Sequence, residues 1–142
     1  MKISNPLLAA GTFALSASMS IAAPVEYHCD YKVHGRGGFL SKNAIYVVDE
    51  AAGTAKALDR VVSHFHKNPI DAALSRPSQK RIQLDWEIEG FPVSNSFKEN
   101  FEIDVTYKVS INTSTYASKV RARFDRDARN NLAATGTCKI KK

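Results

Sequence analysis

Alternation of apolar and polar residues is the clearest pattern along this chain. From Val25 to Val33 every odd position is apolar, aromatic or a cysteine, and every even position is charged or a histidine. A period of two residues indicates a β-strand with one buried and one solvated face. The same alternation recurs over residues 81–89, 101–112, 115–124 and 132–140. The chain is therefore predicted to be all-β and antiparallel.

Shorter segments raise the expected number of strands to seven or eight. Residues 45–48 and 54–58 flank a turn that contains Gly53, and residues 70–75 are a further candidate strand. Residues 59–67 fit either a short helix capped by Asp59 or another strand, and the sequence leaves this choice open. The predicted architecture is a barrel or a sandwich of antiparallel strands.

The hairpin over residues 101–124 can be assigned a register. A two-residue turn at Thr113 and Ser114 would place Ile111 opposite Tyr116, and Ser118 would be the one polar residue facing inward. A shift by two residues keeps the same faces, so it stays open as an alternative, whereas a shift by one would bury arginines. Either register puts one basic cluster on the outer face, consisting of Lys108, Lys119 and Arg121.

The N-terminal residues resemble an export signal. Lys2 is the first charged residue, an apolar stretch follows it, and Ser20-Ile21-Ala22 fits a small-x-small cleavage site. The apolar stretch is shorter than the ~20 residues that span a bilayer. We therefore expect residues 1–22 to be a cleaved signal peptide and residues 23–142 to be a single β domain, periplasmic or secreted, without a transmembrane segment.

The two cysteines, Cys29 and Cys138, lie near the two ends of this domain. In an oxidising compartment they are expected to form one disulfide, and their spacing excludes a Cys-x-x-Cys redox motif. The disulfide would make the first and last strands neighbours, which suits a closed sheet.

Three short features carry a resemblance to other proteins. Tyr27-His28-Cys29 near the start, a central strand with Trp86, and Gly136-Thr137-Cys138 near the end are together similar to a group of small exported bacterial β proteins. The resemblance implies a common fold with a disulfide between terminal strands, and it brings no assigned activity. The tied terminal strands also resemble those of lipocalin-like barrels by analogy.

The charge balance points to anionic partners. The chain has 20 Lys and Arg against 14 Asp and Glu, and only one of the basic residues lies in the expected signal peptide. A basic outer face formed by Lys108, Lys119 and Arg121 would attract an anionic envelope component or an acidic protein. Nucleic acid is not expected, because the protein is exported and this face lacks aromatic residues on which bases could stack.

A second candidate contact is the segment from residue 90 to 100, which has the composition of a loop. It carries three apolar side chains, Phe91, Val93 and Phe97. Apolar groups in an exposed loop serve as contacts for a partner, or here they would close one end of the barrel.

No catalytic, metal or cofactor motif emerges. His64 and His66 would share one face of a strand, where His28 could complete a metal site, but on a helix they would diverge. We therefore expect the histidines to lie on the surface, and we expect no metal, no cofactor and no enzymatic activity.

The leading hypothesis is a non-enzymatic binding protein that uses the basic face and residues 90–100. One alternative is an inhibitor of a secreted hydrolase. The other is a carrier of a small apolar ligand inside the barrel, with a cavity lined by Tyr27, Tyr31, Trp86, Phe101, Tyr107 and Phe124.

Overall fold

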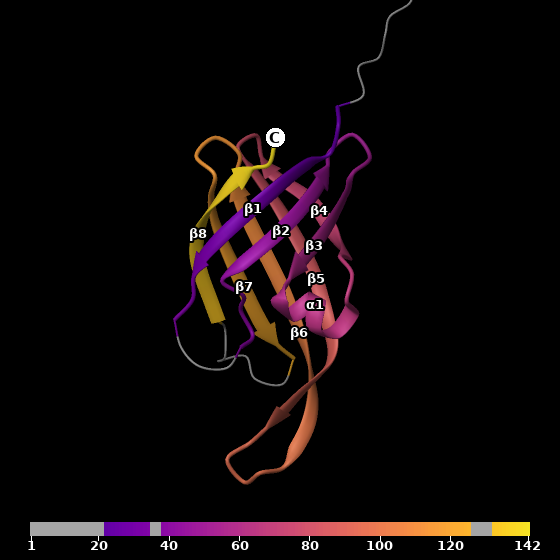
Figure 1. Cartoon of the computed structure of the whole chain (residues 1–142), viewed down its shortest axis with the longest axis vertical. Coiled ribbons are helices and arrows are strands. Elements are labelled where there is room, and N and C mark those ends of the chain that lie inside the picture. Colours follow the sequence, from indigo (N-terminus) through magenta and orange to yellow (C-terminus); the bar gives the residue numbers. More distant parts are fainter. Residues whose placement is uncertain (1–21, 35–37, 126–131) are drawn as a thin grey trace, which may run out of the picture.

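The protein forms a closed eight-stranded antiparallel barrel with one short helix (Figure 1). The structure is a computed structural model that describes residues 22–34, 38–125 and 132–142. The expected signal peptide lies outside these residues apart from Ala22. The elements are β1 (Val25–Lys32), β2 (Asn43–Asp49), β3 (Thr54–Asp59), α1 (Arg60–His66), β4 (Ile70–Ser78), β5 (Arg81–Ser94), β6 (Asn100–Asn112), β7 (Ala117–Phe124) and β8 (Leu132–Ile140).

Each strand pairs with its neighbour in sequence, and β1 closes the sheet by pairing with β8. Cys29 and Cys138 lie directly opposite each other in this last pairing and form the predicted disulfide. Gly136 lies opposite Tyr31 on the same seam, and a Cβ atom there would overlap the backbone carbonyl of Asp30. The seam therefore requires glycine at this position, because only a residue without a side chain lets the two backbones approach so closely.

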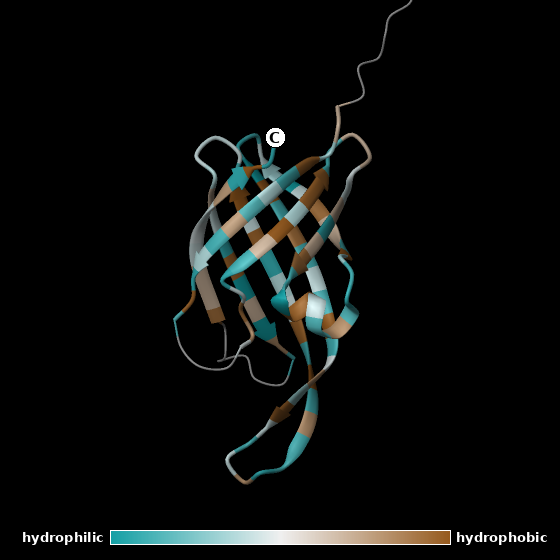
Figure 2. Ribbon diagram, in the orientation of Figure 1, coloured by the Kyte–Doolittle hydropathy of each residue, from teal (hydrophilic) through white to brown (hydrophobic). Residues whose placement is uncertain are grey.

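Alternation along the strands separates a packed interior from a polar exterior (Figure 2). Large aromatic side chains fill the middle of the barrel. The rings of Trp86 and Tyr107 stack with their centroids 5.4 Å apart, and the ring centroids of Tyr46 and Trp86 lie 5.9 Å apart. Offset or tilted ring pairs at these distances add stability beyond their buried area.

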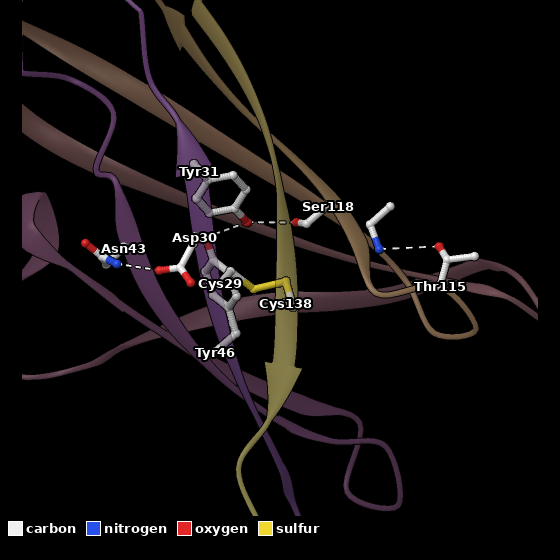
Figure 3. Close-up of a disulfide and its surroundings, with 9 residues drawn as sticks. Cys29, Asp30, Tyr31, Asn43, Tyr46, Thr115, Ser118 and Cys138 are labelled. Atoms are coloured by element: carbon white, nitrogen blue, oxygen red, sulfur yellow. Dashed lines mark hydrogen bonds between the residues drawn. A yellow bond between two sulfur atoms is a disulfide. The ribbon is translucent and has the colours of Figure 1, made fainter.

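The inward-facing Ser118 has a hydrogen-bonded partner. Its hydroxyl lies 2.7 Å from the hydroxyl of Tyr31, which in turn donates to the hydroxyl of Tyr46 at 3.3 Å (Figure 3). A buried hydroxyl is costly unless it is paired, so this small network explains how a serine is tolerated in the core. Burial raises the pKa of both Tyr31 and Tyr46, which keeps the network neutral.

The register of the β6–β7 hairpin is the one shifted by two residues, and the predicted two-residue turn is wrong. Ile111 lies opposite Ser118, and Lys108 lies opposite Arg121. Asn112 causes the difference, because its side chain accepts hydrogen bonds from the backbone N–H groups of Ser114 and Thr115. This Asx turn extends the connection to four residues. The inner and outer faces stay as predicted.

The open question about residues 59–67 is resolved in favour of the helix. Asp59 caps α1 by accepting a hydrogen bond from the backbone N–H of Val62 at 2.8 Å. Val61 and Val62 are buried, and Lys67 ends the helix in a left-handed conformation. The helix follows β3 and packs beside one end of the barrel (Figure 1).

Only residues 95–99 of the segment 90–100 lie outside the strands, which corrects the prediction of a loop over its whole length. β5 continues to Ser94 and β6 begins at Asn100, so the two strands form a ribbon that projects beyond the barrel (Figure 1). The register shifts between Ile88 and Phe91, and Gly90 there has a φ of 66°. Such a β-bulge bends the strand where it leaves the barrel. The composition hid the strand because Gly90, Pro92 and two serines are weak strand formers.

The disulfide is expected to contribute strongly to stability. Replacing both cysteines by alanine should lower the free energy of unfolding by about 4–5 kcal/mol in the chain-entropy model, because the bond joins residues 109 positions apart. Urea unfolding of the C29A/C138A variant and of the oxidised parent measures this difference. Equal urea concentrations at the unfolding midpoint would show that strand pairing alone holds β1 and β8 together.

The capping residue gives a prediction with a pH dependence. Burial raises the pKa of Asp59, so the folded chain keeps this proton at pH values where the unfolded chain has lost it. The free energy of unfolding should therefore fall as pH rises from the pKa of Asp59 in the unfolded chain to its higher pKa in the folded chain. Asp59→Asn should preserve the cap and flatten this slope, whereas Asp59→Ala should cost about 1 kcal/mol. Unfolding curves across acid pH test both statements, and equal stability of the two variants would contradict the cap.

Candidate functional site

Cations gather on the outer face of three adjacent strands, β5 to β7. Alternation on β7 points Lys119, Arg121 and Arg123 outward, and each is exposed. On the neighbouring β6 the outward position opposite Arg121 is Lys108. Arg81 begins β5 and is also exposed. The three predicted residues thus lie together, and two further arginines extend the cluster.

These side chains border two adjoining depressions. One, of about 400 Å³, is lined by Lys108, Lys119 and Arg121 together with Thr106, Arg123, Leu132 and Ala133. The other, of about 280 Å³, shares the same three cations and adds Pro77, Arg81, Gln83 and Ser110. Because the lining residues overlap, we treat the two depressions as one surface feature, the basic groove.

The electrostatics of the basic groove are strongly one-sided. Lys108 forms an ion pair with Asp85, with Nζ and Oδ1 separated by 3.6 Å. Within the described part of the chain, no carboxylate forms an ion pair with the other four cations of the groove. Lys108 and Arg121 also lie directly opposite each other on the paired strands β6 and β7. Like charges in such positions destabilise a sheet. The groove therefore carries an excess of positive charge.

Sequence reasoning missed Arg81 as a member of this site. Its position depends on the pairing of β5 with β6, which places Arg81 opposite Asn112 at one end of the groove. The predicted pairing of Ile111 with Tyr116 would place Arg123 opposite Asp104, but the observed register places it opposite Thr106. The shift removes a predicted neutralising partner from the cluster.

The three apolar residues predicted for the segment 90–100 have different surroundings. Phe91 packs at the end of the barrel, with its ring centroid 4.7 Å from Phe39 and 4.9 Å from Phe65. Val93 is half-buried on the ribbon opposite Phe101. Phe97 is 82% exposed at the ribbon tip. Phe91 thus helps to close the barrel end, and Phe97 alone of the three is presented to solvent.

The turn that carries Phe97 is held by Asn95. The side-chain oxygen of Asn95 accepts hydrogen bonds from the backbone N–H groups of Phe97 and Glu99, at 2.9 and 3.1 Å. Its amide nitrogen donates to the carboxylate of Glu99 at 2.9 Å. The turn therefore fixes the backbone from which the exposed ring of Phe97 projects.

The histidines do not converge in the structure. His64 and His66 lie two positions apart on α1, and His28 pairs with Glu26 at 2.6 Å on β1. Among the described residues no group of three His, Cys, Asp or Glu side chains could hold a metal ion.

The six aromatic residues proposed to line a ligand cavity lie in three places. Phe124 is half-buried, and its ring centroid lies 4.7 Å from that of Phe39. Tyr27, Tyr31, Trp86 and Tyr107 are buried in the barrel. Phe101 lies on the ribbon beyond the barrel and is 37% exposed, so it does not belong to the barrel interior.

A further depression, of about 850 Å³, lies where β2 begins and β3 meets α1. Its charged lining residues have both signs, since Lys42 and Arg60 accompany Asp59. Although it is larger than the basic groove, it offers less selectivity for an ion of one charge.

Comparisons with protein-family models, with curated proteins and with solved structures gave no match. Over the described residues, no helix combines the length and the apolar composition needed to cross a membrane. The fold and the groove therefore define the class of this protein by themselves: a small, disulfide-closed antiparallel barrel with a cationic outer groove.

The crowding of like charges has a measurable cost. Replacing Arg121 by glutamine should raise the free energy of unfolding by about 0.2–1 kcal/mol at low salt, because it removes the repulsion with Lys108. The gain should shrink in high salt, where exposed charges are screened. As a control, Lys56→Gln removes a cation that pairs with Asp71 at 2.7 Å and should give no gain. Thermal or urea unfolding at two salt concentrations measures both, and a salt-independent effect would contradict the electrostatic cause.

Proposed function

We propose that this chain is an exported, non-enzymatic binding protein that holds an anionic partner in the basic groove. The observation that carries the proposal is the concentration of Arg81, Lys108, Lys119, Arg121 and Arg123 around two joined depressions. A surface that keeps cations close together at a cost in stability is understandable when an anion neutralises them in use.

The ribbon tip supplies a second contact in this proposal. Phe97 is 82% exposed, and the hydrogen bonds of Asn95 order the backbone that carries it. A turn that is already ordered loses little backbone freedom on binding, which favours a contact of the exposed ring with a protein partner or an envelope surface. Phe91 and Val93 support this tip by anchoring the ribbon to the barrel end.

The proposed compartment is the periplasm or the extracellular space. The disulfide is compatible with an oxidising environment, and the first 22 residues have the composition of a cleaved signal. The resemblance to small exported bacterial β proteins fits the same compartment and leaves the partner to be defined by the groove.

The binding surface can be tested with a matched pair of triple variants. K108Q/K119Q/R121Q removes three cations from the groove. K56Q/R76Q/K141Q removes the same charge from other faces, where each cation has a carboxylate partner. At about 1 kcal/mol per cation near an anionic surface, the first variant should bind anionic phospholipid vesicles about 100-fold more weakly at low salt. The second should bind nearly as the parent does.

The same variants should be compared on an immobilised sulfated polysaccharide, read out as the salt concentration that elutes the protein. Equal loss in the two triple variants would mean that net charge alone drives binding. Unchanged binding of K108Q/K119Q/R121Q to both probes would contradict the proposal.

A further inference from the structure

We propose that the basic groove binds an extended segment of an acidic polysaccharide, with carboxylate groups repeated along its length, and not a single compact anion. This inference rests on the proposed function, and it adds the shape and the chemistry of the ligand. It is carried by the length of the groove, the placement of its cations and the composition of its floor.

The groove is long because its two depressions share Lys108 of β6 and extend from it in opposite directions along that strand, one to Thr106 and the other to Ser110. Arg81 lies opposite Asn112 of β6, and Arg123 lies opposite Thr106 of the same strand. These two positions are six residues apart on β6, which corresponds to about 20 Å at the usual rise per residue. Two arginines so far apart cannot contact one phosphate or one carboxylate together. They can contact different groups of one extended chain.

The remaining cations occupy the space between the two arginines. Lys119 and Arg121 are two positions apart on one face of β7, a separation of about 7 Å, and both line each depression. The ammonium of Lys108 is drawn toward Asp85. A ligand would therefore meet positive charge at intervals along its path, with the weakest contribution from Lys108.

The floor of the groove favours a carbohydrate chain over other polyanions. Thr106, Ser110 and Gln83 offer hydroxyl and amide groups that can pair with sugar hydroxyls, and Leu132 and Ala133 offer apolar surface for C–H faces. Guanidinium groups can pair with carboxylates through two parallel hydrogen bonds. None of the lining residues is aromatic, so unpaired nucleic-acid bases would find no ring on which to stack.

The test is a chain-length series of oligogalacturonates, titrated into the mature, oxidised protein by calorimetry at constant ionic strength. Affinity should rise steeply with chain length and level off once the oligomer spans the groove. R81Q and R123Q should each weaken binding of the long oligomers about fivefold, the loss expected for one cation. Binding of the disaccharide, which can be held by the central cations, should change little in either variant.

A matched control is R76Q, which removes an arginine that pairs with Glu50 away from the groove. It should leave the whole length series unchanged. All three arginines are at or near the surface, so each variant is expected to keep the parent's thermal midpoint, and this is measured first.

Two further titrations, together with the length series, separate this inference from the proposed function. Tighter binding of polyphosphate than of oligogalacturonate of matched length would overturn the choice of a polysaccharide as the ligand. Tighter binding of a single-stranded oligonucleotide would overturn it too. Affinity that does not depend on oligomer length, or that is unaffected by R81Q and R123Q, would overturn the extended mode while the groove remained an anion site. Absence of binding to every anion tested would overturn both the inference and the proposed function.

Discussion

Closure of the sheet between β1 and β8 is the constraint on which the rest of the structure depends. A barrel has no free edges only if its first and last strands pair in one register. Here that register is fixed by the disulfide between Cys29 and Cys138 and by the close approach of two backbones at Gly136. Once the seam is set, alternation decides for every strand which residues pack inside and which face solvent.

The cationic groove is a consequence of this closure. Lys119, Arg121 and Arg123 are outward only because Val120 and Ala122 between them pack in the core. The same alternation presents Lys108 on the adjacent strand, so four cations share one surface without any loop to carry them. Paired strands fix the backbone positions of these cations, so the like charges can separate only as far as their side chains reach. That fixed spacing underlies the cost in stability expected for the free protein and, under the proposed function, the binding of an extended anion.

Sequence reasoning recovered the parts of the structure that follow from local periodicity. The long strands, their buried faces and the grouping of Lys108, Lys119 and Arg121 all follow from the period of two residues. Features that depend on a single turn-forming side chain or on the pairing of separate strands were missed. The Asx turn at Asn112 goes with a hairpin register shifted by two residues, which places Arg123 opposite Thr106. The separate pairing of β5 with β6 brings Arg81 to the groove's end.

The ribbon shows why composition alone misplaces a strand. Gly90 and Pro92 suggest a loop, yet Gly90 donates its backbone N–H to the carboxylate of Asp104 and takes the positive φ that the bulge needs. Pro92 is tolerated because the ribbon leaves the barrel and one of its edges needs no ladder partner. Gly90 and Pro92 therefore do not end the strand: it bends outward at the bulge, and the tip of the ribbon presents Phe97 to solvent.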